Sequence, residues 1–375
     1  MSLINKAYEK SIQVLEHCSK KEGFYASGLK GGYRAVWARD SMIASLGASL
    51  VGIKFKNTIK SSLELLSKHQ SELGQIPNCI GSYNIERRSK ITFNTIDSTL
   101  WYIIGHYNYA KAYNDTSLLE KYANNIARAI IWLKYQDPNE DKLLTQLPTM
   151  DWQDAFPHKY GRTINTNALY YYVLNLIGEN KLAEYIKNVI NGKTQKYLSL
   201  YDKQKGYYLP WIWKNHDGDR EQGEWFDSLG NILAIVFNLA TPKIASNILF
   251  YIKKNRINKP FALKAIWPPI KKENKDWFSY FAKCDARQPF HYLNAGVWPF
   301  IGGFYVLALV KTKRNKEAQI ELENLAKANM QKLNGYEFNE WLDGRSGKPK
   351  GEPYQAWSAG SYILAYYATK GKILI

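Results

Sequence analysis

Residues 152–174 read WQDAFPHKYGRTINTNALYYYVL, and this stretch decides the fold. Asp154 stands there among aromatic residues and turn formers, and a segment rich in Thr and Asn follows it, as at the start of a helix. From Ile164 onward, apolar side chains return at the three- and four-residue spacing of a helix. The segment therefore predicts an acidic residue on a loop that leads into a buried helix.

The same order, a polar residue followed by an apolar helix, recurs along the chain. Asp40, Asp97 and Asp154 follow one another at intervals of 57 residues. Later positions of the same kind are Glu224, Asp227, Asn294 and Glu340. A repeat of about this length with varied side chains is typical of helical hairpins that are arranged in an array.

The helices expected along the chain are of two kinds. Residues 3–19 and 56–73 predict amphipathic helices with one polar face, whereas residues 97–113 and 296–310 are apolar on every side. A helix that is apolar all round must be buried, and amphipathic helices cover it from outside. About twelve helices of alternating kind, with almost no strand-type alternation, predict an all-α (α/α)6 toroid of six inner and six outer helices. No linker divides them, so residues 1–375 are expected to form a single domain.

Composition and hydropathy favour a globular protein without a membrane span. The chain has 375 residues, 45% of them hydrophobic, which is ample for a large core. The longest apolar run, residues 297–310, is too short to cross a bilayer, and the first residues lack the apolar segment of a signal peptide. A cytoplasmic location is therefore expected. The three cysteines have no spacing typical of a disulfide framework or a zinc site.

The formal net charge of +18 raises the question of nucleic acid as a partner. The basic residues are mostly lysines spread through solvent-type positions, and no nucleic-acid-binding motif accompanies them. We therefore expect neither nucleic acid nor a membrane as a partner. The sequence gives no expectation about an oligomer.

The polar residues before the inner helices are expected to surround one mouth, because the loops that enter those helices share one end of such a ring. Any single Asp at a helix start can be merely a cap. A set of such positions interleaved with tryptophans points instead to a sugar site, since aromatic rings stack on the apolar faces of sugars and carboxylates accept hydrogen bonds from hydroxyls. The six positions are Asp40, Asp97, Asp154, Asp227, Asn294 and Glu340.

Cleavage of a glycoside requires two acids in different protonation states. Asp154 is the candidate acid, because Trp152 and Phe156 would desolvate it and Asp151 would repel its negative charge. Glu340 is the candidate base. The plain alternative for Glu340 is a solvated loop charge.

Several motifs resemble the inverting glycosidases with an (α/α)6 barrel, a group that contains glucoamylases, amylo-α-1,6-glucosidases and neutral/alkaline invertases. They are AVWARDS at 35–41, TIDSTLWYII at 95–104, the stretch around Asp154, and FNEWLDGRSGK at 338–348, in the family's order. The resemblance implies that Arg39 and Asp40 hold the terminal sugar, that Asp154 is the general acid, and that Glu340 is the base. It implies no metal or organic cofactor. Other residues expected to bind substrate are Trp37, Asp97, Trp101, Trp152, His158, Asp227, Asn294, Trp298, Gln355 and Trp357.

The expected function is therefore an inverting glycoside hydrolase that acts on a small α-glucoside or a related oligosaccharide. Inversion predicts carboxyl groups roughly 6.5–9.5 Å apart. Two alternatives stay open. A polysaccharide lyase or unsaturated-uronyl hydrolase on a similar toroid would have a Tyr/His pair in the mouth and Glu340 turned away. A non-catalytic glycan-binding protein would have the toroid without activity.

Overall fold

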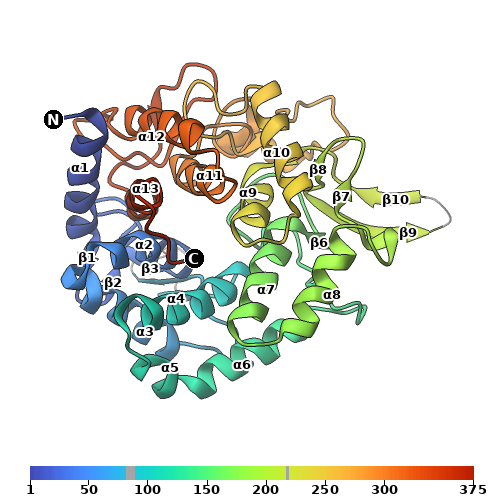
Figure 1. Cartoon of the computed structure of the whole chain (residues 1–375), viewed down its shortest axis with the longest axis horizontal. Coiled ribbons are helices and arrows are strands. Elements are labelled where there is room, and N and C mark those ends of the chain that lie inside the picture. The colour runs from blue at the N-terminus through green and yellow to red at the C-terminus, as the bar shows by residue number, and fades with distance from the viewer. Residues whose placement is uncertain (82–88, 217–218) are drawn as a thin grey trace.

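Helices dominate the structure, a computed structural model that describes residues 1–81, 89–216 and 219–375. Figure 1 shows the inner helices around a common centre, with the outer helices at their backs. Each inner helix contacts the next, and the last contacts the first, so the ring closes. This confirms the predicted (α/α)6 toroid. The inner helices are α2 (Ala38–Ala48), α4 (Asp97–Tyr113), α7 (Ile164–Leu176), α9 (Ser228–Val236), α11 (Pro299–Lys311) and α13 (Ala356–Ala368).

The outer helices bury only one face. In α8, for example, Ala183, Ile186 and Val189 are buried, at the spacing of one helical stripe. The outer layer consists of α1 (Leu3–Cys18), α3 (Lys56–Lys68), α5 (Ser117–Lys121), α6 (Ala123–Lys134), α8 (Asn180–Ile190), α10 (Pro242–Lys254) and α12 (Asn315–Asn329). The sequence predicted one helix over residues 117–135, but Tyr122, with φ −109° and ψ 22°, leaves the helical region and separates α5 from α6.

Every residue of α2 and α9 is buried, as expected for helices that are apolar all round. Helices α2 and α13 approach closely because glycines face each other. A Cβ added to Gly47 would lie 1.9 Å from the carbonyl oxygen of Gly360, and one added to Gly360 would lie 2.5 Å from the Cα of Ala44. Any larger side chain would push these two helices apart.

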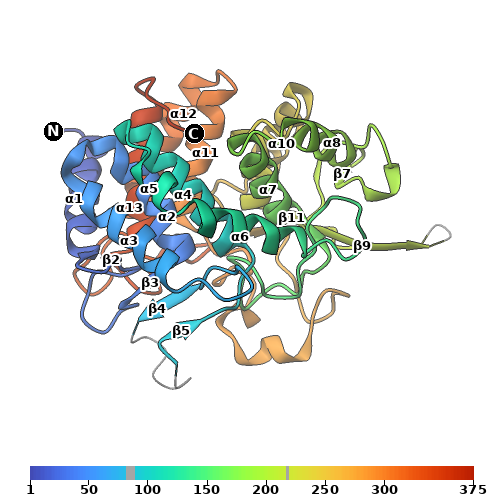
Figure 2. The ribbon, with the colours of Figure 1, turned by 90° about the horizontal axis from the view of Figure 1, so that it is seen from below.

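Short strands lie in the loops, which the sequence did not predict. Figure 2 shows β3 (Ala35–Trp37), β4 (Cys79–Gly81) and β5 (Ile91–Thr92) together at the end of the ring away from the C-terminus. They form one antiparallel sheet, and β10, β9 and β6 form another. Residues 201–224 were expected to be an aromatic loop, whereas β9 and β10 form a hairpin there; residues 217–218 lie outside the described part. The loop expected at 74–94 contains β4 and β5, and its residues 82–88 are also outside that part.

The strands are β1 (Ser19–Lys20), β2 (Gly23–Phe24), β3 (Ala35–Trp37), β4 (Cys79–Gly81), β5 (Ile91–Thr92), β6 (Arg162–Thr163), β7 (Tyr201–Asp202), β8 (Tyr207–Tyr208), β9 (Trp211–His216), β10 (Asp219–Gln222), β11 (Phe226–Asp227), β12 (Ile266–Trp267), β13 (Trp341–Leu342) and β14 (Pro349–Lys350). Single turns of 3-10 helix are η1 (Ser49–Val51), η2 (Ile53–Phe55), η4 (Lys196–Leu198), η5 (Ser279–Lys283) and η6 (Asp285–Arg287). Within the described residues, even the most apolar inner helices lack the length and hydropathy of a membrane span.

Candidate active site

A cavity of about 260 Å³ lies among the loops that enter the inner helices, and both Asp154 and Glu340 line it. Its walls come from distant parts of the chain, since Arg39 and Asp40 belong to the first turn of α2 and Trp357 to the first turn of α13. The remaining lining residues are Ala26, Tyr33, Trp37, Asn78, Asn94, Trp152, Ala155, Tyr292, Trp298 and Gln355.

A second, wider cavity of about 650 Å³ adjoins the first. Tyr33, Tyr292 and Glu340 line both, so Glu340 lies where the two cavities meet. The wider cavity is polar and carries charges of both signs. Its other lining residues are Asp285, Arg287, Gln288, His291, Trp341, Lys350, Gly351 and Glu352.

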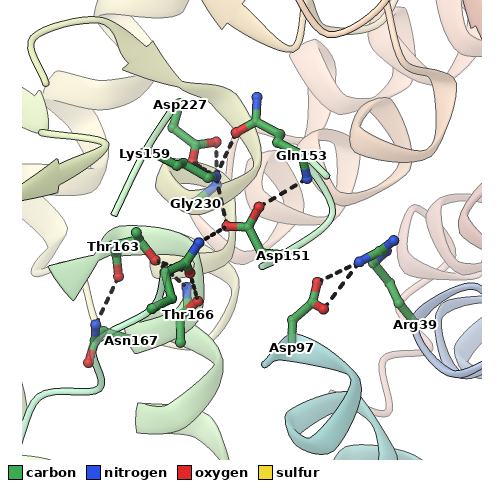
Figure 3. Close-up of polar contacts among 11 residues, drawn as sticks. Arg39, Asp97, Asp151, Gln153, Lys159, Thr163, Thr166, Asn167, Asp227 and Gly230 are labelled. Carbon is green, nitrogen blue, oxygen red and sulfur yellow. Dashed lines mark hydrogen bonds and ion pairs between the residues drawn. The ribbon is translucent and has the colours of Figure 1, made fainter. Parts of the chain in front are cut away.

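Arg39 is held from behind by a buried carboxylate. Its Nη1 donates to both oxygens of Asp97, at 3.1 and 3.0 Å, and the Asp97 side chain is fully buried (Figure 3). Arg39 Nε also lies 3.9 Å from Asp40 Oδ2. A guanidinium group that donates to both oxygens of a carboxylate is held in one orientation. Arg39 therefore keeps its positive charge in a fixed position beside Asp40 and Asp154. Asp97 was expected to bind substrate, but the structure places it beneath Arg39 and away from the cavity wall.

Burial raises the pKa of all three carboxyl groups in the cavity. The pKa of Asp154 rises to about 6, because burial and the charges of Asp97 and Asp151 outweigh the attraction of Arg39. For Asp40, burial raises the pKa to about 7 against the pull of Arg39. One guanidinium thus faces more than one carboxylate, and groups that interact this closely titrate together.

Burial also raises the pKa of Glu340, to about 8, and the charges of Asp40 and Asp154 add to the effect. Two donors oppose it. The backbone N–H of Glu352 donates to Glu340 Oε2 at 3.1 Å, and the hydroxyl of Tyr33 lies 3.3 Å from both carboxyl oxygens. These donors fix the direction of the carboxyl group.

Unpaired hydrogen-bond donors also line the cavity. Trp152 Nε1, Trp357 Nε1 and Gln355 Nε2 are buried, and none of the three has a hydrogen-bond partner among the residues that the structure describes. Buried polar atoms are normally paired, so donors left free at a cavity wall are available to a ligand. Trp298 differs, since its Nε1 donates to the Tyr292 carbonyl at 3.0 Å. Hydroxyl groups of a bound ligand would accept hydrogen bonds from the three free donors.

Two residues expected to bind substrate support the fold instead. Trp101 is 1% exposed and packs on Phe304 of α11, so it belongs to the core between inner helices. Asn294 is fully buried, where its side chain exchanges hydrogen bonds with the backbone N–H and carbonyl of Ile270, both at 2.8 Å. It also donates to the Ala286 carbonyl at 3.0 Å and thereby braces the loop before α11.

Asp227 and His158 also lie outside the cavity, contrary to expectation. Asp227 is the N-cap of α9, where its Oδ1 accepts from the backbone of Gly230 at 3.2 Å, and it is fully buried. His158 points to an outer groove, where its ring stacks on Phe278 with centroids 4.1 Å apart. A polar residue just before an inner helix can point into the mouth, cap the helix or face outward, and the spacing does not distinguish these.

Sequence reasoning missed four polar lining residues, namely Tyr33, Asn78, Asn94 and Tyr292. Tyr33 lies two residues before the AVWARDS motif and Tyr292 lies two residues before Asn294, so proximity to the motifs was their only signal. Asn78 and Asn94 flank β4 and β5, which no periodicity predicted.

We expect Gly351→Ala to lower kcat by displacing Glu340. A Cβ at residue 351 would lie 2.4 Å from Glu340 Oε2 and 2.8 Å from Glu340 Cβ, and Gly351 has φ +69°, which favours glycine. A misplaced reacting group costs on the order of 10²-fold in rate. Steady-state kinetics on the folded variant checks this. Gly371→Ala has a similar φ of +82° and open space around the added Cβ, so it controls for backbone strain. Equal rates in both variants would contradict the expectation.

Comparison with known proteins finds one family model and several similar invertases. The family model described as amylo-alpha-1,6-glucosidase matches residues 10–364. Neutral/alkaline invertase 1, mitochondrial, of Oryza sativa subsp. japonica is 29% identical over 209 residues, which are 52% of this chain and 32% of that protein. Cytosolic invertase 1 of the same plant is 31% identical over 147 residues, 38% of this chain and 25% of that protein. The matches thus span about a third or less of these relatives' own length.

Solved structures share the fold along the whole chain. A mannosylglycerate hydrolase from Thermus thermophilus in complex with glucose superposes with a TM-score of 0.67 at 14% identity, covering 98% of this chain and 100% of that one. A rhamnosidase from Klebsiella oxytoca with rhamnose bound gives a TM-score of 0.64 at 13% identity, covering 97% and 64%. At such identities the likeness shows the fold alone.

Proposed function

The chain belongs to the amylo-alpha-1,6-glucosidase family, and from this premise we propose that it is an inverting glycoside hydrolase with Asp154 as general acid and Glu340 as general base. The observation that carries the proposal is that two acids far apart in the sequence line one small cavity beside Arg39. Asp154 donates its proton to the glycosidic oxygen, while Glu340 takes a proton from the water that attacks the opposite face of the sugar.

The two cavities suit an enzyme that removes a terminal sugar. The inner cavity, about 260 Å³, lies below the usual range of about 300–1,000 Å³ for ligand pockets and would hold one sugar ring. Arg39 and Asp40, together with the free donors of Trp152, Gln355 and Trp357, would bind its hydroxyls. The wider cavity beyond Glu340 would admit the attacking water to the base. We therefore propose a small α-glucoside or a related oligosaccharide as substrate.

The cavity carboxyl groups give a specific pH dependence. Below about pH 6 both Asp154 and Glu340 carry protons and no base is present, whereas above about pH 8 both are ionised and no acid is present. We expect kcat/KM to be bell-shaped, rising through about pH 6 and falling above about pH 8. Initial rates measured from about pH 4 to about pH 10 check this expectation. A maximum near pH 4, about the ordinary carboxyl pKa, would contradict the burial argument.

In the unliganded protein the higher pKa belongs to Glu340, so the single proton of the pair prefers the proposed base. The productive form, with the proton on Asp154, is then the less populated one. Both proton arrangements give the same bell-shaped profile. The roles of the two acids therefore have to be separated by substrates that differ in their need for an acid.

A substrate screen tests the proposal. Purified protein is incubated with sucrose, maltose, isomaltose, trehalose, kojibiose and mannosylglycerate, the last because a structural relative is named for it. Hydrolysis of at least one compound by the parent, and not by Asp154→Asn, supports the proposal. Sugar binding without turnover would support the glycan-binding alternative, and an unsaturated product the lyase. Against the lyase, Glu340 lines the cavity and is not turned away.

We further propose that residues 1–375 act as one domain, because α1 packs on both α12 and α13 and joins the two ends of the chain. The cytoplasmic location stays a prediction, and among the relatives one is named mitochondrial and another cytosolic.

A further inference from the structure

A fully buried lysine stands directly behind the cavity. The ammonium group of Lys159 has no exposed surface and contacts Asp151 Oδ2 at 2.8 Å, Gln153 Oε1 at 2.6 Å and Asp227 Oδ2 at 3.2 Å (Figure 3). Burial lowers the pKa of this ammonium, but the carboxylates of Asp151 and Asp227 outweigh burial and hold the pKa above its usual value. Lys159 is therefore charged, and no step of the proposed reaction uses it.

The contacts of Lys159 close the loop that carries Asp154. Asp151 and Lys159 stand on either side of Asp154 in the chain, and their ion pair joins the two ends of the loop. Gln153 adds two contacts within the loop, because its side chain accepts from Lys159 and its backbone N–H donates to Asp151 Oδ1 at 2.9 Å. The loop is thus tied to itself by side chains that are all fully buried.

The side chains that contact Lys159 also anchor the loop to two inner helices. Asp227 caps α9 through Gly230 while its other oxygen accepts from Lys159. On the other side, Gln146 donates to Asp151 at 3.3 Å and accepts from Thr163 and Thr166 at the start of α7, at 2.8 and 2.5 Å. Figure 3 shows this continuous chain of polar contacts beneath the loop.

Buried ion pairs are seldom needed for stability, because apolar residues of similar volume often serve as well. One that fixes a reacting group gives an advantage of another kind, since a small displacement of a catalytic group lowers the rate strongly. We propose that Lys159, with Asp151 and Asp227, is a positioning residue that holds the proton donor Asp154 at the glycosidic oxygen. This inference rests on the proposed function and adds a role for residues that do not touch the substrate.

The test is the double variant Lys159→Met/Asp227→Asn. It removes one positive and one negative charge, so the net charge behind Asp154 is kept, whereas Lys159→Met alone would leave two buried carboxylates without their cation. The variant is assayed on the disaccharide that the parent hydrolyses fastest and on the α-glycosyl fluoride of the same sugar. Fluoride leaves without a proton, so only the disaccharide depends on the position of Asp154.

We expect kcat on the disaccharide to fall by about 10- to 100-fold, with KM changed less than about threefold and the fluoride rate within about threefold of the parent. Asp227→Asn alone keeps the ammonium and a capping oxygen, and we expect a smaller loss with the same selectivity. The control Glu321→Gln alters another buried carboxylate, which accepts from Asn258 at 2.7 Å away from the cavity, and should leave both rates unchanged.

The outcomes separate this inference from the proposed function. If the parent is active and the folded double variant keeps both rates, or loses both in parallel, Lys159 does not position the acid. If circular dichroism shows that the double variant is unfolded, Asp227→Asn takes its place. Unchanged rates, or equal losses on both substrates, in Asp227→Asn would then show that Lys159 does not position the acid. If the parent hydrolyses neither substrate, the proposed function fails, and this inference fails with it.

Discussion

Asp154→Asn is expected to lower kcat on a disaccharide by about 10²- to 10⁴-fold while leaving hydrolysis of the α-glycosyl fluoride nearly intact. An amide of the same shape cannot donate a proton as an acid does, so the glycosidic oxygen would have to leave as an alkoxide. Fluoride needs no such proton. Because the Asp154 side chain lines the cavity and caps none of the helices in the described part of the chain, the substitution should leave the fold unchanged.

Rates on both substrates, measured with parent and variant at the pH of maximum activity, give the comparison. Asp141→Asn alters a carboxyl group paired with Arg162 outside the cavity and serves as the matched control. Equal losses on the two substrates would show that Asp154 does something other than protonate the leaving group.

Glu340→Gln is expected to lower kcat on both substrates by about 10²- to 10⁴-fold, because water must be activated whichever group leaves. The amide oxygen of glutamine can still accept the Glu352 N–H that holds Glu340 Oε2 at 3.1 Å, so the side chain should keep its place. The two substitutions therefore give different patterns, selective for Asp154 and general for Glu340. The reversed pattern would exchange the two roles and agree with the higher pKa of Glu340.

The architecture could be predicted because the apolar pattern of each helix shows by itself whether that helix is buried or lies at the surface. A segment such as α11, apolar on all sides, has to be inside, and α12, with charges along one face, has to be outside. Six alternations of this kind leave few arrangements other than a ring of hairpins. The hairpin of β9 and β10 was not predicted, because its residues show no clear alternation and its pairing partner β6 lies far away in the sequence.

The position of a polar residue before an inner helix could be predicted, but the direction of its side chain could not. Asp40, in the first turn of α2, lines the cavity, whereas Asp97, the first residue of α4, points to Arg39 and lies beneath it. Asp227 likewise turns to Lys159. Each direction depends on a buried cation supplied by another segment, so tertiary contacts decide which carboxylates face the substrate. Tyr33 and Asn78 reach the cavity through loops and short strands without a helical period.

The most direct measurement is the configuration of the sugar at the moment of cleavage. Proton NMR of the first-formed product, recorded before mutarotation, follows the anomeric signals of the best α-linked substrate. We expect the β-anomer to appear first, because in the proposed mechanism Asp154 and Glu340 act from opposite faces of the sugar ring with water between the ring and the base. The α-anomer appearing first would mean retention through a covalent intermediate, and would contradict the assignment of these two acids as an inverting pair.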